Sequence, residues 1–169
     1  MARELVNQNH LSLLKYTTCP YYCPPEGYLN CAFYGTEVDI WALGCIWIEM
    51  LLGRPYFKSL STTNQDIKLL KSFGLCNATI DNSTDILESI PIPELQRARA
   101  YKLLHSLNLE EYQNLHTLLS NTDCTKEELK ILQKIFNLSP FDRISAEELL
   151  KESFFEIPST NIILSSSMY

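Results

Sequence analysis

The sequence predicts a mainly α-helical fold, and three observations support that prediction. Two stretches, Thr125-Lys-Glu-Glu128 and Ser145-Ala-Glu-Glu148, have the Ser/Thr-x-x-Glu form of a helix capping box. Apolar residues recur at helical spacing in several segments, and no segment shows a confident strand pattern. The 169 residues, 46% of them hydrophobic and 20% charged, are enough for one domain with its own core.

The N-terminal part of the chain has no regular pattern. Residues 1–20 show no sustained helical or strand period, so we expect a loop there. Residues 20–28, PYYCPPEGY, hold three prolines and one glycine. Because proline removes a backbone donor and restricts φ, this stretch is expected to be extended and turn-like.

Residues 36–52, TEVDIWALGCIWIEMLL, predict the longest helix. Thr36 is the expected N-cap, with Asp39 three residues later as a variant of the capping box. Gly53 and Pro55 are expected to end the helix. Apolar residues lie all round it, a pattern typical of a buried central helix rather than a surface helix.

The middle of the sequence alternates helical patterns with a polar stretch. Ile67, Leu70 and Phe73 recur every three residues and predict a helix over 63–73, with Gly74 as its C-terminal cap. The polar, proline-containing stretch over 76–93 is expected to be a long loop. Further helices are expected over 94–107 and 110–119.

The two capping boxes predict the last helices. The box at Thr125 opens a helix over 126–137, and the box at Ser145 opens a short helix over 146–152. Residues 157–169 end in Ser-Ser-Ser-Met-Tyr and are expected to be a flexible tail. In the helix expected over 126–137, the apolar stripe consists of Leu129, Leu132, Ile135 and Phe136.

The charge balance argues against a polyanionic partner. Lys and Arg number 14 against 20 Asp and Glu, for a net charge of −6. A chain of this sign lacks the electrostatic footprint of a nucleic-acid binder, and it is not suited to an anionic membrane surface. The five glycines fall into neither of the common phosphate-binding loop patterns.

The cysteines and histidines do not suggest a metal site. The six cysteines include no C-x-x-C pair, and the three histidines keep no ligand spacing with them. The N-terminal residues lack the apolar stretch of a signal peptide, and the longest apolar run, 40–52, has only 13 residues and includes Glu49. We therefore expect reduced thiols and an intracellular protein of the cytoplasm or nucleus, with no membrane span.

Four stretches are hard to explain as generic helix and loop. They are YYCPPE at 21–26, DIWALGC at 39–45, EMLLGRPYF at 49–57 and SPFDRI at 139–144. In this order they resemble the C-terminal lobe of a eukaryotic protein kinase: the W-Y-x-A-P-E end of the activation segment, the start of the central helix, its continuation, and the D-P-x-x-R-I motif. The resemblance covers about residues 1–156.

Further stretches are similar to the mitogen-activated protein kinases, within the wider group that includes the cyclin-dependent kinases. Phe73-Gly74 and the later RARAYKLLHSL at 97–107 resemble that family's pattern. Tyr16 falls where the family has its activation-loop tyrosine, and Met1-Ala-Arg-Glu4 resembles the residues that follow its metal-binding D-F-G. The resemblance implies the large lobe of the kinase fold, incomplete, from the activation segment to the last helix.

The resemblance implies roles for particular residues. Glu26 and Arg143 match an ion pair of the family, the alternative being two unrelated surface charges. Asp39 matches the aspartate that holds the catalytic loop, the alternative being a solvated capping residue. Trp41 is a core anchor in either case. The other matches are Gly44, a structural glycine; Tyr16, a phosphorylation candidate or an ordinary loop tyrosine; and Cys19, Tyr22 and Pro25, a candidate substrate-docking loop.

The departures from the family concern catalysis. The matching region starts after D-F-G, and no glycine-rich loop, ATP-contacting lysine or H-R-D motif is found in these residues. Leu14 stands in place of the phosphorylated threonine, and Pro20 and Cys23 replace two arginines. We therefore expect no catalytic residue, metal or cofactor in this chain, with ATP and Mg²⁺ implied for the family only.

Three readings of function stay open at this point. The first is the large-lobe half of a mitogen-activated-type Ser/Thr kinase, with an activation-segment-like loop at 1–35, a helical part at 36–156 and a tail at 157–169. It would act with a protein substrate or partner, including a missing N-terminal kinase half. The second is a non-catalytic, pseudokinase-like module that binds proteins, and the third is an unrelated helical protein.

Overall fold

The computed structural model describes residues 21–31, 35–58, 68–69, 71–72, 75–76, 80–106 and 113–156. Within these ranges the regular structure is entirely helical, which confirms the predicted mainly α fold. The expected loop over 1–20 and tail over 157–169 lie outside them. The elements are α1 (Pro25–Tyr28), α2 (Glu37–Leu52), α4 (Ile80–Ser89), α5 (Glu94–Ser106), α6 (Leu115–Leu119), α7 (Lys126–Ile135), η2 (Pro140–Asp142), α8 (Ala146–Leu149) and η3 (Ser153–Phe155).

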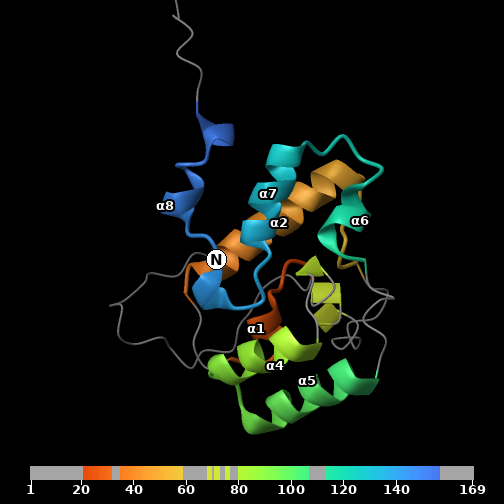
Figure 1. Ribbon diagram of the computed structural model, residues 1–169, viewed down its shortest axis with the longest axis vertical. Helices are drawn as coiled ribbons and strands as arrows, with labels where there is room; N and C mark the ends of the chain where they lie inside the picture. The colour runs from red at the N-terminus through yellow and green to blue at the C-terminus, as the bar shows by residue number, and fades with distance from the viewer. Residues whose placement is uncertain are drawn as a thin grey trace, which may run out of the picture.

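Two groups of helices surround two hydrophobic clusters (Figure 1). Helix α2 runs beside α7, and α6 packs on α7, around a cluster that includes Trp41 and Leu132. Helices α4 and α5 pair at the other end of the molecule, around a cluster that includes Leu87 and Ala100. Helix α1 lies between the two groups and contributes Tyr28 to the second cluster.

Helix α2 has the predicted extent, but its N-terminal cap differs from the prediction. Thr36 is the N-cap residue, yet its side chain makes no capping hydrogen bond, and the expected box with Asp39 is wrong. The reason is the backbone of Thr36, which is helical (φ −68°, ψ −15°), whereas a capping side chain needs an extended residue. Gly53 ends the helix as predicted, with a left-handed φ of 67° that glycine adopts without strain.

The prediction that α2 is buried on all sides is wrong for one stripe. Trp41 and Ile48 are fully buried, but Leu43, Ile46 and Met50 are 41%, 45% and 70% exposed. These three positions share one face because they are separated by three and four residues. Helix α7 packs on a different part of the surface of α2.

No helix of the described ranges is both long and apolar enough to cross a membrane.

The proline-rich segment is extended only in part. Pro24 has the expected extended backbone (φ −76°, ψ 165°), but residues Pro25–Tyr28 form one helical turn, which corrects the prediction for 20–28. Proline suits the first position of a helix, because its fixed φ is already helical and its missing N–H would have no helical partner there. Pro25 occupies this position.

Helix α4 lies where the sequence predicts a loop, so that prediction is wrong for Ile80–Ser89. Its residues are weak helix formers, but Leu87 and the following Ile90 are fully buried beside α5. Arg97 of α5 closes the end of the helix by donating hydrogen bonds to the carbonyl oxygens of Leu87 (2.6 Å) and Ile90 (3.4 Å). Tertiary packing therefore overrides local propensity here.

The other middle helices agree with the predictions more closely. The described residues of 63–73, namely 68, 69, 71 and 72, are helical, and α5 begins at Glu94 as predicted. The helix expected over 110–119 begins only at Leu115. Its N-cap is Asn114, which is extended and accepts a hydrogen bond from the Thr117 N–H at 2.9 Å. An N-cap asparagine in this conformation marks the start of a helix.

Both predicted capping boxes are confirmed. The Thr125 N–H donates to Glu128 at 2.8 Å, and the Glu128 N–H donates back to the Thr125 hydroxyl at 3.2 Å. Ser145 and Glu148 make the same reciprocal pair at 2.9 and 3.2 Å. Helices α7 and α8 end at Ile135 and Leu149, two and three residues before the predicted ends. Differences of this size are common at helix ends.

The box at Thr125 makes a prediction about pH. Hydrogen bonds, first of all the one from the Thr125 backbone, lower the pKa of Glu128 below its ordinary 4.5. A lowered folded-state pKa means that Glu128 stabilises the fold above pH 4.5, and that this contribution is lost as the pH falls through the lower value. The stability difference between wild type and Glu128→Gln should therefore shrink from pH 7 to pH 3 in urea unfolding. Parallel stability curves would contradict this.

Candidate functional site

The most heavily bonded side chain of the described region is Arg143. Its Nη1 and Nη2 donate to the two carboxylate oxygens of Glu26 at 2.8 and 3.0 Å, which makes the ion pair bidentate. Nη1 also donates to the Glu37 carbonyl oxygen at 2.7 Å, and Nε and Nη2 donate to the Asn137 carbonyl oxygen at 3.4 and 3.2 Å. The two ionised side chains are 0% and 1% exposed, so the predicted pair is present and fully desolvated.

Four separate parts of the chain supply these groups. Glu26 lies in α1, held by the stiff Pro24-Pro25 backbone, and Arg143 follows the 3₁₀ turn η2. Glu37 is the first residue of α2, and Asn137 lies just after α7. Because all five N–H groups of a guanidinium have acceptors here, the Arg143 side chain joins residues more than 100 positions apart.

The buried ring of Trp41 packs against the guanidinium of Arg143, as expected of a core anchor. Its side chain is fully buried, and the Arg143 guanidinium carbon lies 5.1 Å from the ring centroid. Phe136 meets it edge-on at 4.9 Å, and Phe57 lies 6.2 Å away. Within the described ranges the indole N–H has no hydrogen-bond partner. Cation–π contact and aromatic packing therefore place the tryptophan.

Gly44 lies where α2 and α7 approach most closely. A Cβ atom on this residue would come within 3.0 Å of Ile135 and Phe136 side-chain carbons. Two helices can approach this closely only where one of them has no side chain. Gly44 is thus a packing glycine of the α2–α7 contact.

The remaining candidate residues make no hydrogen bond to the side chains of the Glu26–Arg143 pair within the described ranges. Asp39 is exposed on α2. Tyr22 is half-buried, and its hydroxyl donates to the Glu49 carboxylate at 2.9 Å, while Pro25 is buried in α1. Tyr16 and Cys19 fall outside the described residues, so their assignments stay predictions.

Sequence reasoning missed several polar partners of these residues. The sequence marks Glu49 only as part of a motif and Glu128 only as a capping residue. In the structure Glu49 accepts a hydrogen bond from the Tyr22 hydroxyl, and Glu128 accepts one from the Trp47 indole N–H at 3.3 Å. The backbone carbonyls of Glu37 and Asn137 carry no signal in a sequence. Only the folded chain shows that they face Arg143.

Three cysteines have raised thiol pKa values: Cys23 and Cys45, which are buried, and Cys76, which is half-buried. Burial, with the nearby Glu26 carboxylate as a second cause, raises the pKa of Cys23 to about 12. Burial likewise raises the pKa of Cys76 to about 12 and raises that of Cys45. A thiol that stays protonated at neutral pH is a poor nucleophile and a poor metal ligand. No three His, Cys, Asp or Glu side chains gather as a metal site within the described ranges.

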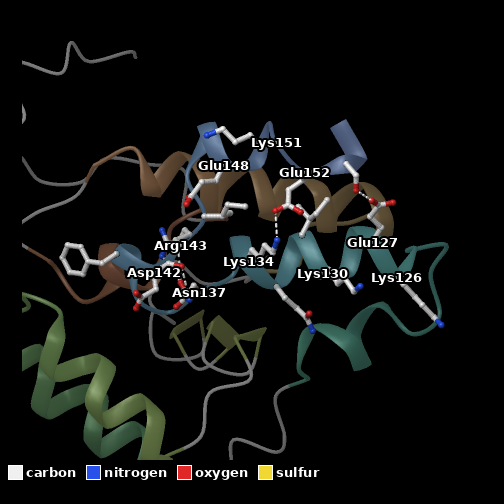
Figure 2. Close-up of a pocket in the computed structure, with 15 residues that line it drawn as sticks. Lys126, Glu127, Lys130, Lys134, Asn137, Asp142, Arg143, Glu148, Lys151 and Glu152 are labelled. Atoms are coloured by element: carbon white, nitrogen blue, oxygen red, sulfur yellow. Dashed lines mark hydrogen bonds and ion pairs between the residues drawn. The ribbon is translucent and has the colours of Figure 1, made fainter. Parts of the chain in front are cut away.

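A groove of about 1250 Å³ runs between α7 and the α8–η3 segment (Figure 2). Arg143, Asn137 and Asp142 lie together at one end of it, and Lys134 reaches across to Glu152 at 2.6 Å. At the other end Glu127 accepts a hydrogen bond from the Ser153 hydroxyl. The lining thus consists largely of charged side chains, and the bonds among them, Lys134 to Glu152 and Ser153 to Glu127, join one wall of the groove to the other.

The chain is similar to known protein kinases over most of its length. A model of the protein kinase domain family matches residues 1–155. The chain is 28% identical over 159 residues to "Probable serine/threonine-protein kinase glkA" of Dictyostelium discoideum, covering 94% of this chain and 30% of that protein. It is 30% identical over 151 residues to mitogen-activated protein kinase 15 of Rattus norvegicus, covering 86% and 24%. It is also 30% identical over 151 residues to mitogen-activated protein kinase 12 of Danio rerio, covering 89% and 38%.

These comparisons agree with the geometry described above. The chain spans 24% to 38% of the length of the three relatives. Its helices around α2, and the buried pair that joins α1 to the residue after η2, have the mainly helical architecture of a C-terminal kinase lobe. The chain belongs to the protein kinase domain family and, within it, resembles the mitogen-activated protein kinases.

Proposed function

We propose that this chain is the substrate-facing part of a Ser/Thr protein kinase of the mitogen-activated type, and that it does not transfer phosphate as an isolated chain. The observation that carries the proposal is the bidentate pair of Glu26 and Arg143, 0% and 1% exposed. Such a pair is costly to bury, so its value lies in fixing one arrangement of the segments it joins.

The pair fixes the segment at residues 21–31 against α2 and the last helices. This segment carries the stretch YYCPPE, which resembles the end of a kinase activation segment. In that family the activation segment faces the protein substrate, so the half-buried Tyr22 becomes a contact for a protein partner under this proposal. The buried Pro25 supports the same loop from inside, and Cys19 precedes both in the sequence. Tyr16 is proposed as a phosphorylation site on the same grounds. The resemblance also suggests the cytoplasm or nucleus as the site of action.

The proposal assigns no catalytic residue to these 169 residues. Phosphoryl transfer depends on positioning ATP and Mg²⁺ and neutralising their charge. The sequence holds no G-x-G-x-x-G loop and no H-R-D motif that would do so. The catalytic parts, and with them the ATP and Mg²⁺ of the family, would come from a preceding kinase half.

The test compares this chain with an extended one. The 169-residue chain, incubated with radiolabelled ATP, Mg²⁺ and a generic protein substrate, should give no transfer above background and no nucleotide-induced thermal shift. The same chain extended by its upstream reading frame, if H-R-D and D-F-G are in frame, should give saturable transfer. Turnover by the short chain would refute the proposal. Stop codons upstream, or an inactive extended chain, would favour the non-catalytic binding module.

A further inference from the structure

Three cations gather around Tyr21 and Tyr56, in a chain whose net charge is −6: Lys68 lies over the Tyr21 ring, Lys71 lies over the Tyr56 ring, and Arg54 precedes Tyr56 by two residues. They are Arg54, just after α2, and Lys68 and Lys71 from the helical residues that follow. Lys68 and Lys71 are three residues apart, so they share one face of their helix. The fold therefore brings positive charges from two parts of the chain to one place.

Two tyrosine rings position the lysines. The Lys68 Nζ atom lies 5.6 Å from the centroid of the Tyr21 ring, and the Lys71 Nζ atom lies 5.1 Å from that of Tyr56. Lys71 also donates a hydrogen bond to the Tyr56 carbonyl oxygen at 3.2 Å. These contacts hold the ammonium groups over aromatic faces, so the lysines are not free to separate in solvent.

The electrostatics show that these cations repel one another. Burial lowers the pKa of Lys71, and the positive charges of Arg54 and Lys68 lower it further. Among the described residues, no carboxylate opposes this shift of the Lys71 pKa. A cluster of like charges held together in this way is stabilised when an anion approaches it.

The three side chains differ in access. Arg54 is exposed and Lys71 is half-buried, so their N–H groups can reach a ligand. Lys68 is buried, so it contributes its positive charge to the cluster without contacting the ligand. Tyr21, next to Lys68, begins the segment that the Glu26–Arg143 pair holds in place. Whatever binds the cluster would therefore lie next to the segment that the proposed function assigns to the protein substrate.

We propose that Arg54, Lys68 and Lys71 form a docking site for an acidic segment of a protein partner. The inference rests on the proposed function for the choice of a protein as the ligand, and it adds a class of substrate or partner, one with clustered carboxylates or phosphates near the contact point. Tyr21 and Tyr56 supply flat apolar surfaces beside the charges, which suits a peptide. The acidic character of the whole chain disfavours a long nucleic acid.

The experiment is fluorescence polarisation with the 169-residue chain and fluorescein-labelled peptides. One peptide carries six glutamates in a Gly/Ser background, a second carries six glutamines, and a third carries two phosphoserines. The chain variants are Arg54→Gln and Lys71→Met. Lys126→Gln and Lys130→Gln on α7, which line the groove beside α8, are the charge-matched controls. Thermal melts of each variant report whether it folds.

The glutamate or the phosphoserine peptide should bind more tightly than the glutamine peptide, and added salt should weaken that binding. Arg54→Gln and Lys71→Met should each weaken it by about two- to fivefold, the range of an exposed charge pair. The α7 controls should not change it, and the better of the two anionic peptides shows whether carboxylate or phosphate is preferred. Arg54 is exposed, so its variant remains informative even if Lys71→Met fails to fold.

Equal affinities for the three peptides would overturn the proposal, and so would equal losses in the Arg54 and α7 variants. The second result would mean that net charge alone attracts the peptides. The assay contains no nucleotide and measures no transfer, so its outcome is independent of the phosphoryl-transfer test. A failed docking site would leave the proposed kinase function standing, and a failed transfer test would leave the docking result standing.

Discussion

Replacing Glu26 with glutamine, or Arg143 with methionine, should lower the free energy of unfolding by about 3–5 kcal/mol. The two side chains are 1% and 0% exposed and bond to each other at 2.8 and 3.0 Å. Removing one of them leaves the other as an uncompensated charge in a site without water access, and that penalty exceeds the loss of the hydrogen bonds themselves. The loss should appear in urea unfolding as a lower midpoint with an unchanged slope.

A double-mutant cycle separates this pair from an ordinary surface pair. The double variant Glu26→Gln/Arg143→Met should lose much less than the sum of the two single losses, because it leaves no unpaired charge. Glu147 and Lys151 form the matched control. The Lys151 Nζ atom lies 2.9 Å from Glu147 Oε1, as in the buried pair, but the two side chains are 83% (Glu147) and 69% (Lys151) exposed. Glu147→Gln should cost less than about 1 kcal/mol. Single losses below about 1 kcal/mol at Glu26 and Arg143 that simply add would contradict the buried geometry.

Replacing Gly44 with alanine should destabilise the protein by about 1–3 kcal/mol, although the same change inside most helices is stabilising. The added Cβ would come within 3.0 Å of carbons in Ile135 and Phe136, so α2 and α7 would have to move apart or repack. Phe136 cannot yield freely, because it also packs edge-on against Trp41. The overpacking at the helix contact therefore outweighs the gain in helix propensity.

A compensating variant tests the cause of that loss. Ile135→Leu removes the branch at Cβ whose methyl group faces Gly44, at nearly constant volume. The combination Gly44→Ala/Ile135→Leu should therefore be more stable than the two single losses predict when added together. A Gly44→Ala variant that gains about 1 kcal/mol, as helix propensity alone would give, would show that the two helices do not pack as described.

Features that depend on residues a few positions apart can be predicted from the sequence. The boxes at Thr125 and Ser145 formed as predicted, and Gly53 ended α2, because each needs only groups within one turn of the chain. The pairing of Glu26 with Arg143 also came from the sequence, through a resemblance of ordered motifs rather than through local pattern.

Features that depend on residues far apart in the sequence follow only from the folded chain. The polar stretch Ile80–Ser89 is a helix because Leu87 finds a buried place beside α5 and Arg97 bonds to its last carbonyls, contacts that no local pattern reports. The expected capping box of Thr36 and Asp39 does not form, because the backbone of Thr36 is helical. The side of α2 that stays exposed, and the cations around Tyr21 and Tyr56, follow from which segments the fold places beside them. That placement depends on the burial of distant side chains against one another.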